Sequence, residues 1–129
     1  MIWKDEGELF VRYKKNPILT VDYWPYKVSS VFNPAAIMVN NTTILLVRVE
    51  DHRGFSHLTV AKSKNGIDGW EIDPKPTFSS DPTYYSEEIY GIEDPRITYI
   101  DEMEKWAIAY TAFSDSGPLT SLAYTDDFT

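Results

Sequence analysis

An internal repeat is the feature that most constrains the fold of this 129-residue chain. Asn33-Pro34 and Asp94-Pro95 lie 61 residues apart, and each precedes a strand, a turn and a second, more apolar strand. Further along, 58–63 aligns with 120–125 at a spacing of 62. A four-stranded unit that recurs at a fixed period is typical of propeller blades.

Short apolar runs separated by turn residues predict the strands of each unit. Asn40-Asn41-Thr42 is a hairpin signal, and 18–31 reads as an ordered loop rich in aromatic residues. No stretch shows a capped helical period. The chain is therefore predicted to be all-β. The predicted strands are 9–13, 35–39, 44–49, 58–63, 70–72, 97–100, 106–111 and 119–125.

The repeat divides the chain into three parts. Residues 1–32 are predicted to form an N-terminal strand and loop, 33–93 a first blade unit and 94–129 an incomplete second one. Two blades cannot close a ring, so we expect the chain to be the opening part of a larger propeller. The last predicted strand would then have an unpaired outer edge, which favours self-association.

Composition excludes several classes of protein. The net charge of −8 argues against nucleic acid and anionic membranes as partners, and the absence of cysteine excludes disulfides and thiolate metal sites. No apolar run has the length of a signal peptide or a membrane span, so we expect a cytoplasmic protein. His52 and His57 lack ligand spacing, and no metal site is predicted.

The motif Glu93-Asp94-Pro95-Arg96 carries the most suggestive chemistry. Pro95 should hold Asp94 in an extended conformation, with Arg96 on the same face and Glu93 on the opposite one. Arginine would lower the pKa of Asp94, whereas burial or the neighbouring carboxylate would raise it. From the residues alone, a structural ion pair and a reactive carboxyl group both remain open.

First strands of propeller blades line the central channel, so Asn33 and Asp94 should face one mouth of it. Arg48 is the only charged residue inside the apolar run 44–49. A charge there is costly unless it is paired. Arg48 is predicted either to pair with a carboxylate such as Asp94 or to donate towards ligand oxygens.

Five blocks of sequence resemble, in order, those of the β-mannoside phosphorylases of glycoside hydrolase family 130. The blocks are 30–36, 46–51, 54–58, 65–70 and 91–96. The resemblance implies a five-bladed propeller and inverting phosphorolysis of β-mannosides to α-mannose 1-phosphate. It implies that inorganic phosphate is the co-substrate and that no other cofactor is needed. By the same resemblance, Asp94 is the general acid, and Asn33, Arg48 and Glu93 bind the substrate.

Two expectations follow from this resemblance. The family's phosphate-binding residues lie in later blades, so this chain alone is expected to be inactive. A general acid also needs a pKa well above the free aspartate value of about 3.9, so Arg96 should pair with Glu93 or Asp101 and not with Asp94. The aromatic residues Trp24, Tyr26, Tyr84, Tyr85 and Tyr90 offer faces for sugar or for packing.

Three alternatives remain at this point. The chain could be a carbohydrate-binding module, an assembling propeller fragment, or part of a β-mannoside hydrolase of the same family. The sequence does not specify the acceptor sugar or the linkage.

Overall fold

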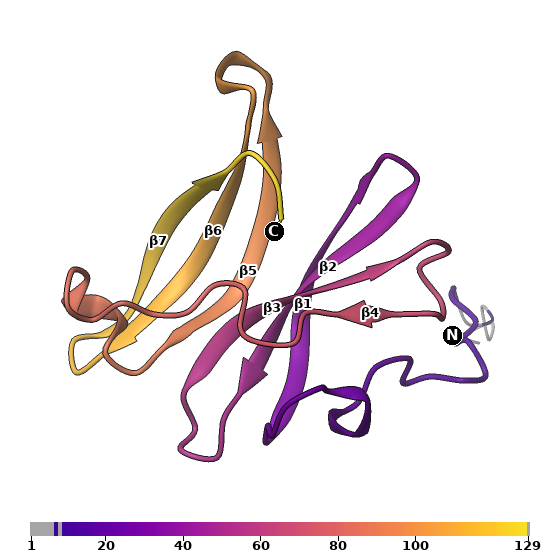
Figure 1. Ribbon diagram of the computed structural model, residues 1–129, viewed down its shortest axis with the longest axis horizontal. Helices are drawn as coiled ribbons and strands as arrows, with labels where there is room; N and C mark the ends of the chain where they lie inside the picture. Colours follow the sequence, from indigo (N-terminus) through magenta and orange to yellow (C-terminus); the bar gives the residue numbers. More distant parts are fainter. Residues whose placement is uncertain (1–6, 8, 129) are drawn as a thin grey trace, which may run out of the picture.

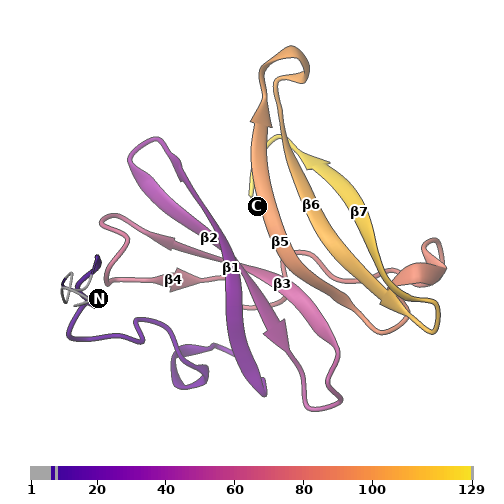
Figure 2. The same ribbon diagram turned by 180° about the vertical axis from the view of Figure 1, so that it is seen from behind.

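The structure is a computed structural model that describes residue 7 and residues 9–128. The described residues form two antiparallel β-sheets, which lie side by side in Figures 1 and 2. The first sheet has the strand order β1-β2-β3-β4 and the second β5-β6-β7, so the predicted all-β fold with two successive antiparallel units is confirmed. The strands are β1 (Ser30–Val39), β2 (Thr42–Glu50), β3 (Ser56–Ser63), β4 (Glu71–Ile72), β5 (Ile92–Ile100), β6 (Lys105–Ser114) and β7 (Gly117–Thr125). The helices of the described residues are the short 3₁₀ helices η1 (Val21–Tyr23), η2 (Ser86–Glu88) and η3 (Asp101–Met103).

Two asparagines form the turn between β1 and β2. Asn40 and Asn41 have φ angles of 48° and 58°, in the left-handed region that asparagine tolerates. Positive φ at both central residues suits a two-residue hairpin, because the twist of such a turn matches that of the flanking strands. The predicted hairpin is therefore confirmed.

The main apolar core lies between the two sheets. Leu46 and Leu58 contribute from the first sheet, and Ile92 and Ile108 from the second. Side chains alternate along a strand, so the next residue of β2, Val47, faces the other side of the first sheet. β2 is therefore apolar on both faces.

The segment before β1 covers that other side of the first sheet. Trp24 is buried there against Val47, Val49 and Ala61. Side chains that pack beside this cluster include Leu19, Tyr26 and Val28. The aromatic loop predicted at 18–31 thus covers one face of the first sheet, although its last two residues belong to β1. Its Trp24 packs into the core.

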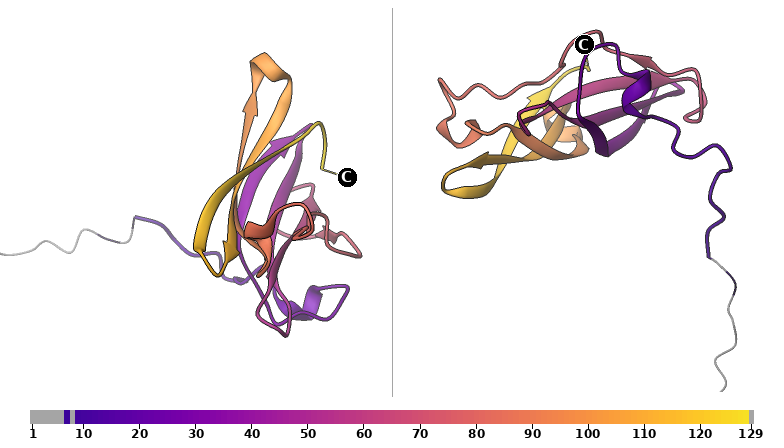
Figure 3. Two further views of the ribbon diagram at one scale, coloured as in Figure 1. Left: turned by 90° about the vertical axis from the view of Figure 1, so that its left-hand side faces the viewer. Right: turned by 90° about the horizontal axis from the view of Figure 1, so that it is seen from below.

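The predicted strand at 9–13 is wrong. These residues are assigned to no strand, and the side chains of Leu9, Phe10 and Val11 are exposed. Figure 3 shows this part of the chain leading away from the sheets. A strand needs a neighbour to satisfy its backbone N–H and C=O groups, and none of the described residues pairs with this segment.

Two other strands begin earlier than predicted. The apolar runs indicate 35–39 and 97–100, but β1 begins at Ser30 and β5 at Ile92. Both strands continue through a proline, Pro34 or Pro95, at a shift in the pairing register. Proline is tolerated within a strand at such a bulge, because the ladder is already interrupted there.

Candidate functional site

Asn33 and Asp94, two of the predicted site residues, lie in matching β-bulges of β1 and β5. Pairing between β1 and β2 shifts between Phe32 and Ala35, and pairing between β5 and β6 shifts between Glu93 and Arg96. Asn33 and Asp94 lie inside these shifts with φ angles of 44° and 48°. The prediction that Pro95 keeps Asp94 extended is therefore wrong. A bulge re-aims side chains, which strict alternation cannot do.

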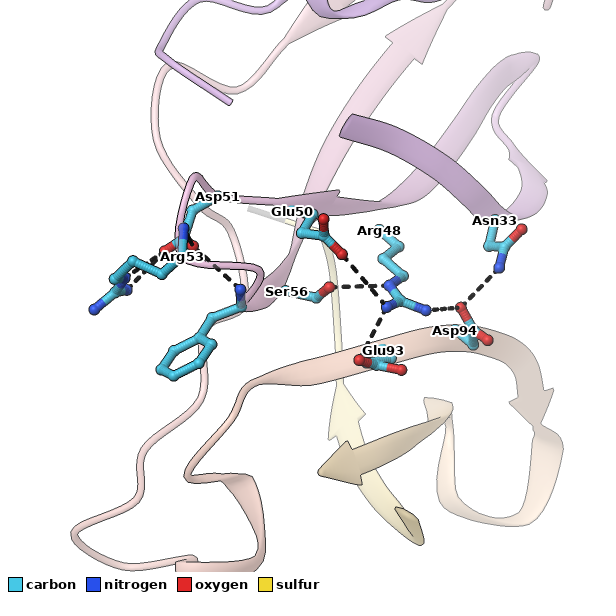
Figure 4. Close-up of polar contacts among 9 residues, drawn as sticks. Asn33, Arg48, Glu50, Asp51, Arg53, Ser56, Glu93 and Asp94 are labelled. Carbon is cyan, nitrogen blue, oxygen red and sulfur yellow. Dashed lines mark hydrogen bonds and ion pairs between the residues drawn. The ribbon is translucent and has the colours of Figure 1, made fainter. Parts of the chain in front are cut away.

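Because of the bulge, two successive carboxylates reach the same arginine. Arg48 Nη2 lies 2.9 Å from Glu93 Oε1, and Arg48 Nη1 donates to Asp94 Oδ1 at 3.0 Å. Glu50 Oε2 is farther away, 4.0 Å from Nη2. Figure 4 shows Glu93 and Asp94 both turned towards the guanidinium. The expectation that Glu93 points away from Asp94 is wrong for the same reason.

Asn33 completes the cluster from the first sheet. Its Nδ2 donates to Asp94 Oδ1 at 3.0 Å, so this single oxygen accepts from both Asn33 and Arg48. The second carboxyl oxygen lies clear of both donors in Figure 4. The side chain of Asp94 is 38% exposed, against 13% for Arg48. Asp94 is thus fixed through one oxygen and open to solvent.

The two carboxyl groups have pKa values shifted in opposite directions. Burial raises the pKa of Asp94, but hydrogen bonds from Asn33 and Arg48 and the charges of Arg48 and Arg96 outweigh it, so the pKa lies below its usual value. Burial raises the pKa of Glu93; Arg48 opposes this, while Asp94 and Glu50 add to it, and the pKa stays above its usual value.

The expected high pKa of Asp94 is therefore absent in the free protein. A carboxyl group with a lowered pKa stabilises the fold at pH values above the usual aspartate pKa. This contribution is lost as the pH falls through the lowered value.

Arg96 does not make the predicted pairs. Its Nη1 donates to the carbonyl oxygen of Pro95 at 2.8 Å, and no ion pair with Glu93 or Asp101 is present among the described residues. Its charge still lowers the pKa of Asp94.

An open groove of about 580 Å³ lies next to these residues. It is lined by 33–36 of β1 and 96–98 of β5, which include Asn33 and Arg96. A groove of this volume is in the range of small-molecule sites.

Three of the five aromatic residues considered for sugar contact have other partners. Trp24 and Tyr26 pack over the first sheet, and Tyr90 donates its hydroxyl to Asp115 Oδ1 at 2.6 Å. Tyr84 and Tyr85 are exposed. Sequence reasoning missed Ser56, whose Oγ accepts from Arg48 Nε at 2.9 Å. A serine at the start of a strand carries no distinctive signal.

A family model described as beta-1,4-mannooligosaccharide phosphorylase, that of glycoside hydrolase family 130, matches residues 8–129. The chain belongs to glycoside hydrolase family 130. The resemblance carried by the five sequence blocks is thereby confirmed.

Proteins similar to this chain include both phosphorylases and hydrolases. A 1,2-beta-oligomannan phosphorylase of Thermoanaerobacter sp. (strain X514) is 37% identical over 94 residues, which cover 67% of this chain and 30% of that protein. A solved structure has a TM-score of 0.80 at 25% identity. Its description states that this family of mannoside phosphorylases contains glycoside hydrolases that target β-1,2 mannosidic linkages in Candida mannan. That match covers 98% of this chain and 41% of the other.

A third relative supports the fold alone. The β-1,2-mannobiose phosphorylase of Listeria innocua has a TM-score of 0.75 at 20% identity, over 91% of this chain and 48% of that one. This chain of family 130 thus spans less than half the length of each of these three proteins.

The described residues carry neither a cluster of metal ligands nor a membrane-spanning helix. No group of three or more His, Asp or Glu side chains there could hold a metal ion. His57 instead forms a hydrogen bond of 2.9 Å between its Nε2 and the hydroxyl of Tyr26. In the same residues, no helix is both long enough and apolar enough to cross a membrane.

Proposed function

We propose that this chain carries the general-acid part of the active site of a β-mannoside phosphorylase, with Asp94 as the acid. The observation that carries the proposal is the position of Asp94, which is held through one oxygen by Asn33 and Arg48 from the other sheet. Asn33 also lines an open groove. Membership of family 130 supports the reaction class.

In the proposed reaction, Asp94 gives its proton to the glycosidic oxygen as the bond to the mannosyl anomeric carbon breaks. Inorganic phosphate attacks that carbon from the opposite face and forms α-mannose 1-phosphate with inversion. An ordinary inverting glycosidase needs a second carboxylate to activate water. Phosphate is already an anionic nucleophile, so one carboxyl group suffices, and no other cofactor is required.

The lowered pKa of Asp94 sets a condition on this reaction. Burial is already the largest single influence on that pKa and acts to raise it. A sugar bound over Asp94 would cover the exposed carboxyl group and strengthen the effect, because loss of water disfavours the charged form. Substrate binding is therefore proposed to load the acid with its proton. Glu93, whose pKa is already raised, is the second candidate for the acid.

Arg48, Asn33 and Glu93 are proposed to orient the sugar. Arg48 and Asn33 supply N–H donors next to the acid, and Glu93 shares the guanidinium of Arg48. A β-mannoside hydrolase of the same family is the runner-up function, because family 130 contains glycoside hydrolases as well as phosphorylases. We propose that groups outside these 129 residues hold the phosphate, in a five-bladed propeller of which the two sheets are blades.

The test is product analysis with the full-length protein that contains this chain. β-1,2- and β-1,4-mannobiose should release α-mannose 1-phosphate, detected by phosphorus NMR, only when inorganic phosphate is present. Release of free mannose without phosphate would assign the hydrolase, and no turnover of either disaccharide would leave a carbohydrate-binding or assembly role.

The chain of 129 residues by itself is proposed to be inactive and to self-associate. β7 pairs only with β6 among the described strands, and Leu119, Leu122 and Tyr124 on it are exposed. An open edge with apolar side chains is a template for another chain. Light scattering should show assemblies that Leu122→Lys diminishes. A monodisperse monomer that carries out phosphorolysis would contradict this proposal.

A further inference from the structure

Ser56 binds the Nε–H of the Arg48 guanidinium, whereas Glu93 and Asp94 contact its two Nη atoms. Ser56 is buried at the start of β3, and its Oγ accepts from Arg48 Nε at 2.9 Å. In the register of the two strands, Ser56 pairs with Glu50 and Leu58 pairs with Arg48, so Ser56 and Arg48 are diagonal neighbours on one face. A hydrogen bond to a charged donor is among the stronger ones in proteins.

This bond fixes the plane of the guanidinium. The five N–H groups of arginine form a rigid planar fork, so the direction of Nε determines where Nη1 and Nη2 point. With Nε on Ser56, Nη1 meets Asp94 and Nη2 meets Glu93. The ring of Phe32 lies 4.5 Å from the guanidinium carbon and restricts it further. Without the hydroxyl, Nε–H loses its partner, and the guanidinium is held by Asp94, Glu93 and the Phe32 ring alone.

The same serine also joins the two sheets. Ser56 forms an isolated parallel bridge with Gly91, the residue immediately before β5. Gly91 has a φ of 105°, and a Cβ on it would lie 2.5 Å from the carbonyl oxygen and 2.7 Å from the nitrogen of Ser56. Only glycine permits this approach without a shift of the backbone. Glu93 and Asp94 follow within three residues of the bridge.

We propose that Ser56 is a positioning residue for the reaction: it orients Arg48 in the first sheet and, through Gly91, sets the distance at which β5 presents Glu93 and Asp94. Its effect on turnover rests on the proposed function, whereas its effect on Arg48 does not. Ser56 is not among the residues that line the groove, and its hydroxyl reaches the site through Arg48.

Hydrogen exchange of arginine Nε–H groups tests the orientation of Arg48 directly. The chain has four arginines, and the exposed Arg53, whose Nε donates to Asp51, is an internal reference. In the full-length protein labelled at arginine Nε, the Nε–H of Arg48 should exchange about tenfold more slowly than that of Arg53. This measurement needs no variant. Equal exchange rates would overturn the proposal.

Ser56→Ala should then raise the exchange rate of the Arg48 Nε–H by about tenfold or more. Ser63→Ala is the matched control, because Ser63 is also buried in β3 but its Oγ donates to the carbonyl oxygen of Asp68. In mannoside phosphorolysis, Ser56→Ala should lower kcat about tenfold with a smaller change in KM. An unchanged Arg48 signal in Ser56→Ala would overturn the positioning role.

A pair of glycine variants tests the contact between the sheets. Gly91 and Gly117 both have positive φ, but a Cβ at Gly117 meets no atom within 4 Å. Gly91→Ala should reproduce the loss of kcat and the altered Arg48 signal, and Gly117→Ala should not. Equal effects of the two variants would overturn the role of the contact. Slow exchange at Arg48 in a protein without phosphorolysis would contradict the proposed function alone.

Discussion

The first and second sheets contain the same bulge, but the residue inside it differs. In β1 it is Asn33 before Pro34, and in β5 it is Asp94 before Pro95, both at positive φ. The amide donates and the carboxylate accepts, so the two bulges meet in one hydrogen bond of 3.0 Å. A repeated backbone feature therefore gives an asymmetric site, because one copy carries an amide and the other an acid.

The sheets also differ in how they are covered. The first sheet packs against the second on one face and against the segment around Trp24 on the other. On β7, Ala123 packs towards the first sheet, so alternation places Leu122 and Tyr124 on the opposite face, where they are exposed. The second sheet thus draws its apolar packing chiefly from the first.

The largest expected effect comes from making the two bulges alike. Asp94→Asn keeps an oxygen that can accept from Asn33 and Arg48 but removes the titrating proton. In the full-length protein it should lower phosphorolysis by about a hundredfold or more, as measured by steady-state release of mannose 1-phosphate. Glu93→Gln is the companion variant. Near-normal turnover in Asp94→Asn and a large loss in Glu93→Gln would transfer the acid role to Glu93.

Because the two sheets are covered differently, replacing a leucine by alanine should lower the free energy of unfolding by different amounts at Leu58 and Leu122. Leu58 is fully buried between the sheets, whereas Leu122 is 53% exposed. Leu58→Ala should lower the free energy of unfolding by about 2–5 kcal/mol in urea titrations. Leu122→Ala should change it by about 0.5 kcal/mol or less. Similar losses at both positions would show that the outer face of the second sheet is covered in solution.

Arg48 of the first sheet forms ion pairs with Glu93 and Asp94 of the second, and its removal should abolish this attraction between the sheets. Arg48→Ala leaves Glu93 and Asp94 as neighbouring carboxylates without their shared cation, and we expect a loss of about 2 kcal/mol in unfolding free energy. Substrate affinity should fall as well. Arg53→Ala is the control, because its pair with Asp51 is exposed and should contribute about 0.5 kcal/mol or less. If both variants unfold at the same denaturant concentration as the parent protein, Arg48 contributes no more than a surface ion pair.

The smallest effect should follow from removing the amide alone. The hydrogen bond from Asn33 lowers the pKa of Asp94, so Asn33→Ala should move that pKa upwards. The reaction needs the protonated acid, so kcat/KM falls as the pH rises through this pKa. The alkaline limb of the pH profile of kcat/KM should therefore shift to higher pH. Asn65→Ala, in the turn after β3, should leave the limb in place. A shift in neither variant would exclude Asp94 as the group that titrates in this limb.

Much of the fold could be read from the sequence because it depends on local patterns. The asparagine pair 40–41 and the apolar runs of β2, β3 and β6 encode their strands directly. The cost of an unpaired charge in an apolar strand gave pairing of Arg48 with a carboxylate as one of two alternatives, and the structure shows the pair with Asp94. The catalytic and binding roles of Asn33, Arg48, Glu93 and Asp94 stay predictions.

The features of the fold and the site that the sequence did not predict depend on how strands pair, which the sequence of one strand does not encode. Alternation places Glu93 and Asp94 on opposite faces, and only the bulge, formed against β6, brings both carboxylates to Arg48. The failed strand at 9–13 has the right composition but lacks a neighbour. The role of Ser56 could not be predicted from the sequence, because it depends on the folded structure placing β3 next to Gly91.

Pro34 has a consequence for how the protein ages. Asparagine deamidates when the backbone nitrogen of the next residue attacks its side-chain amide, which requires an N–H that proline lacks. Pro34 therefore blocks this route at Asn33. Spontaneous conversion of Asn33 to aspartate would place a second negative charge against Asp94, at the position from which the amide now donates. The proline thus preserves, over the lifetime of the molecule, the chemical difference between the two bulges.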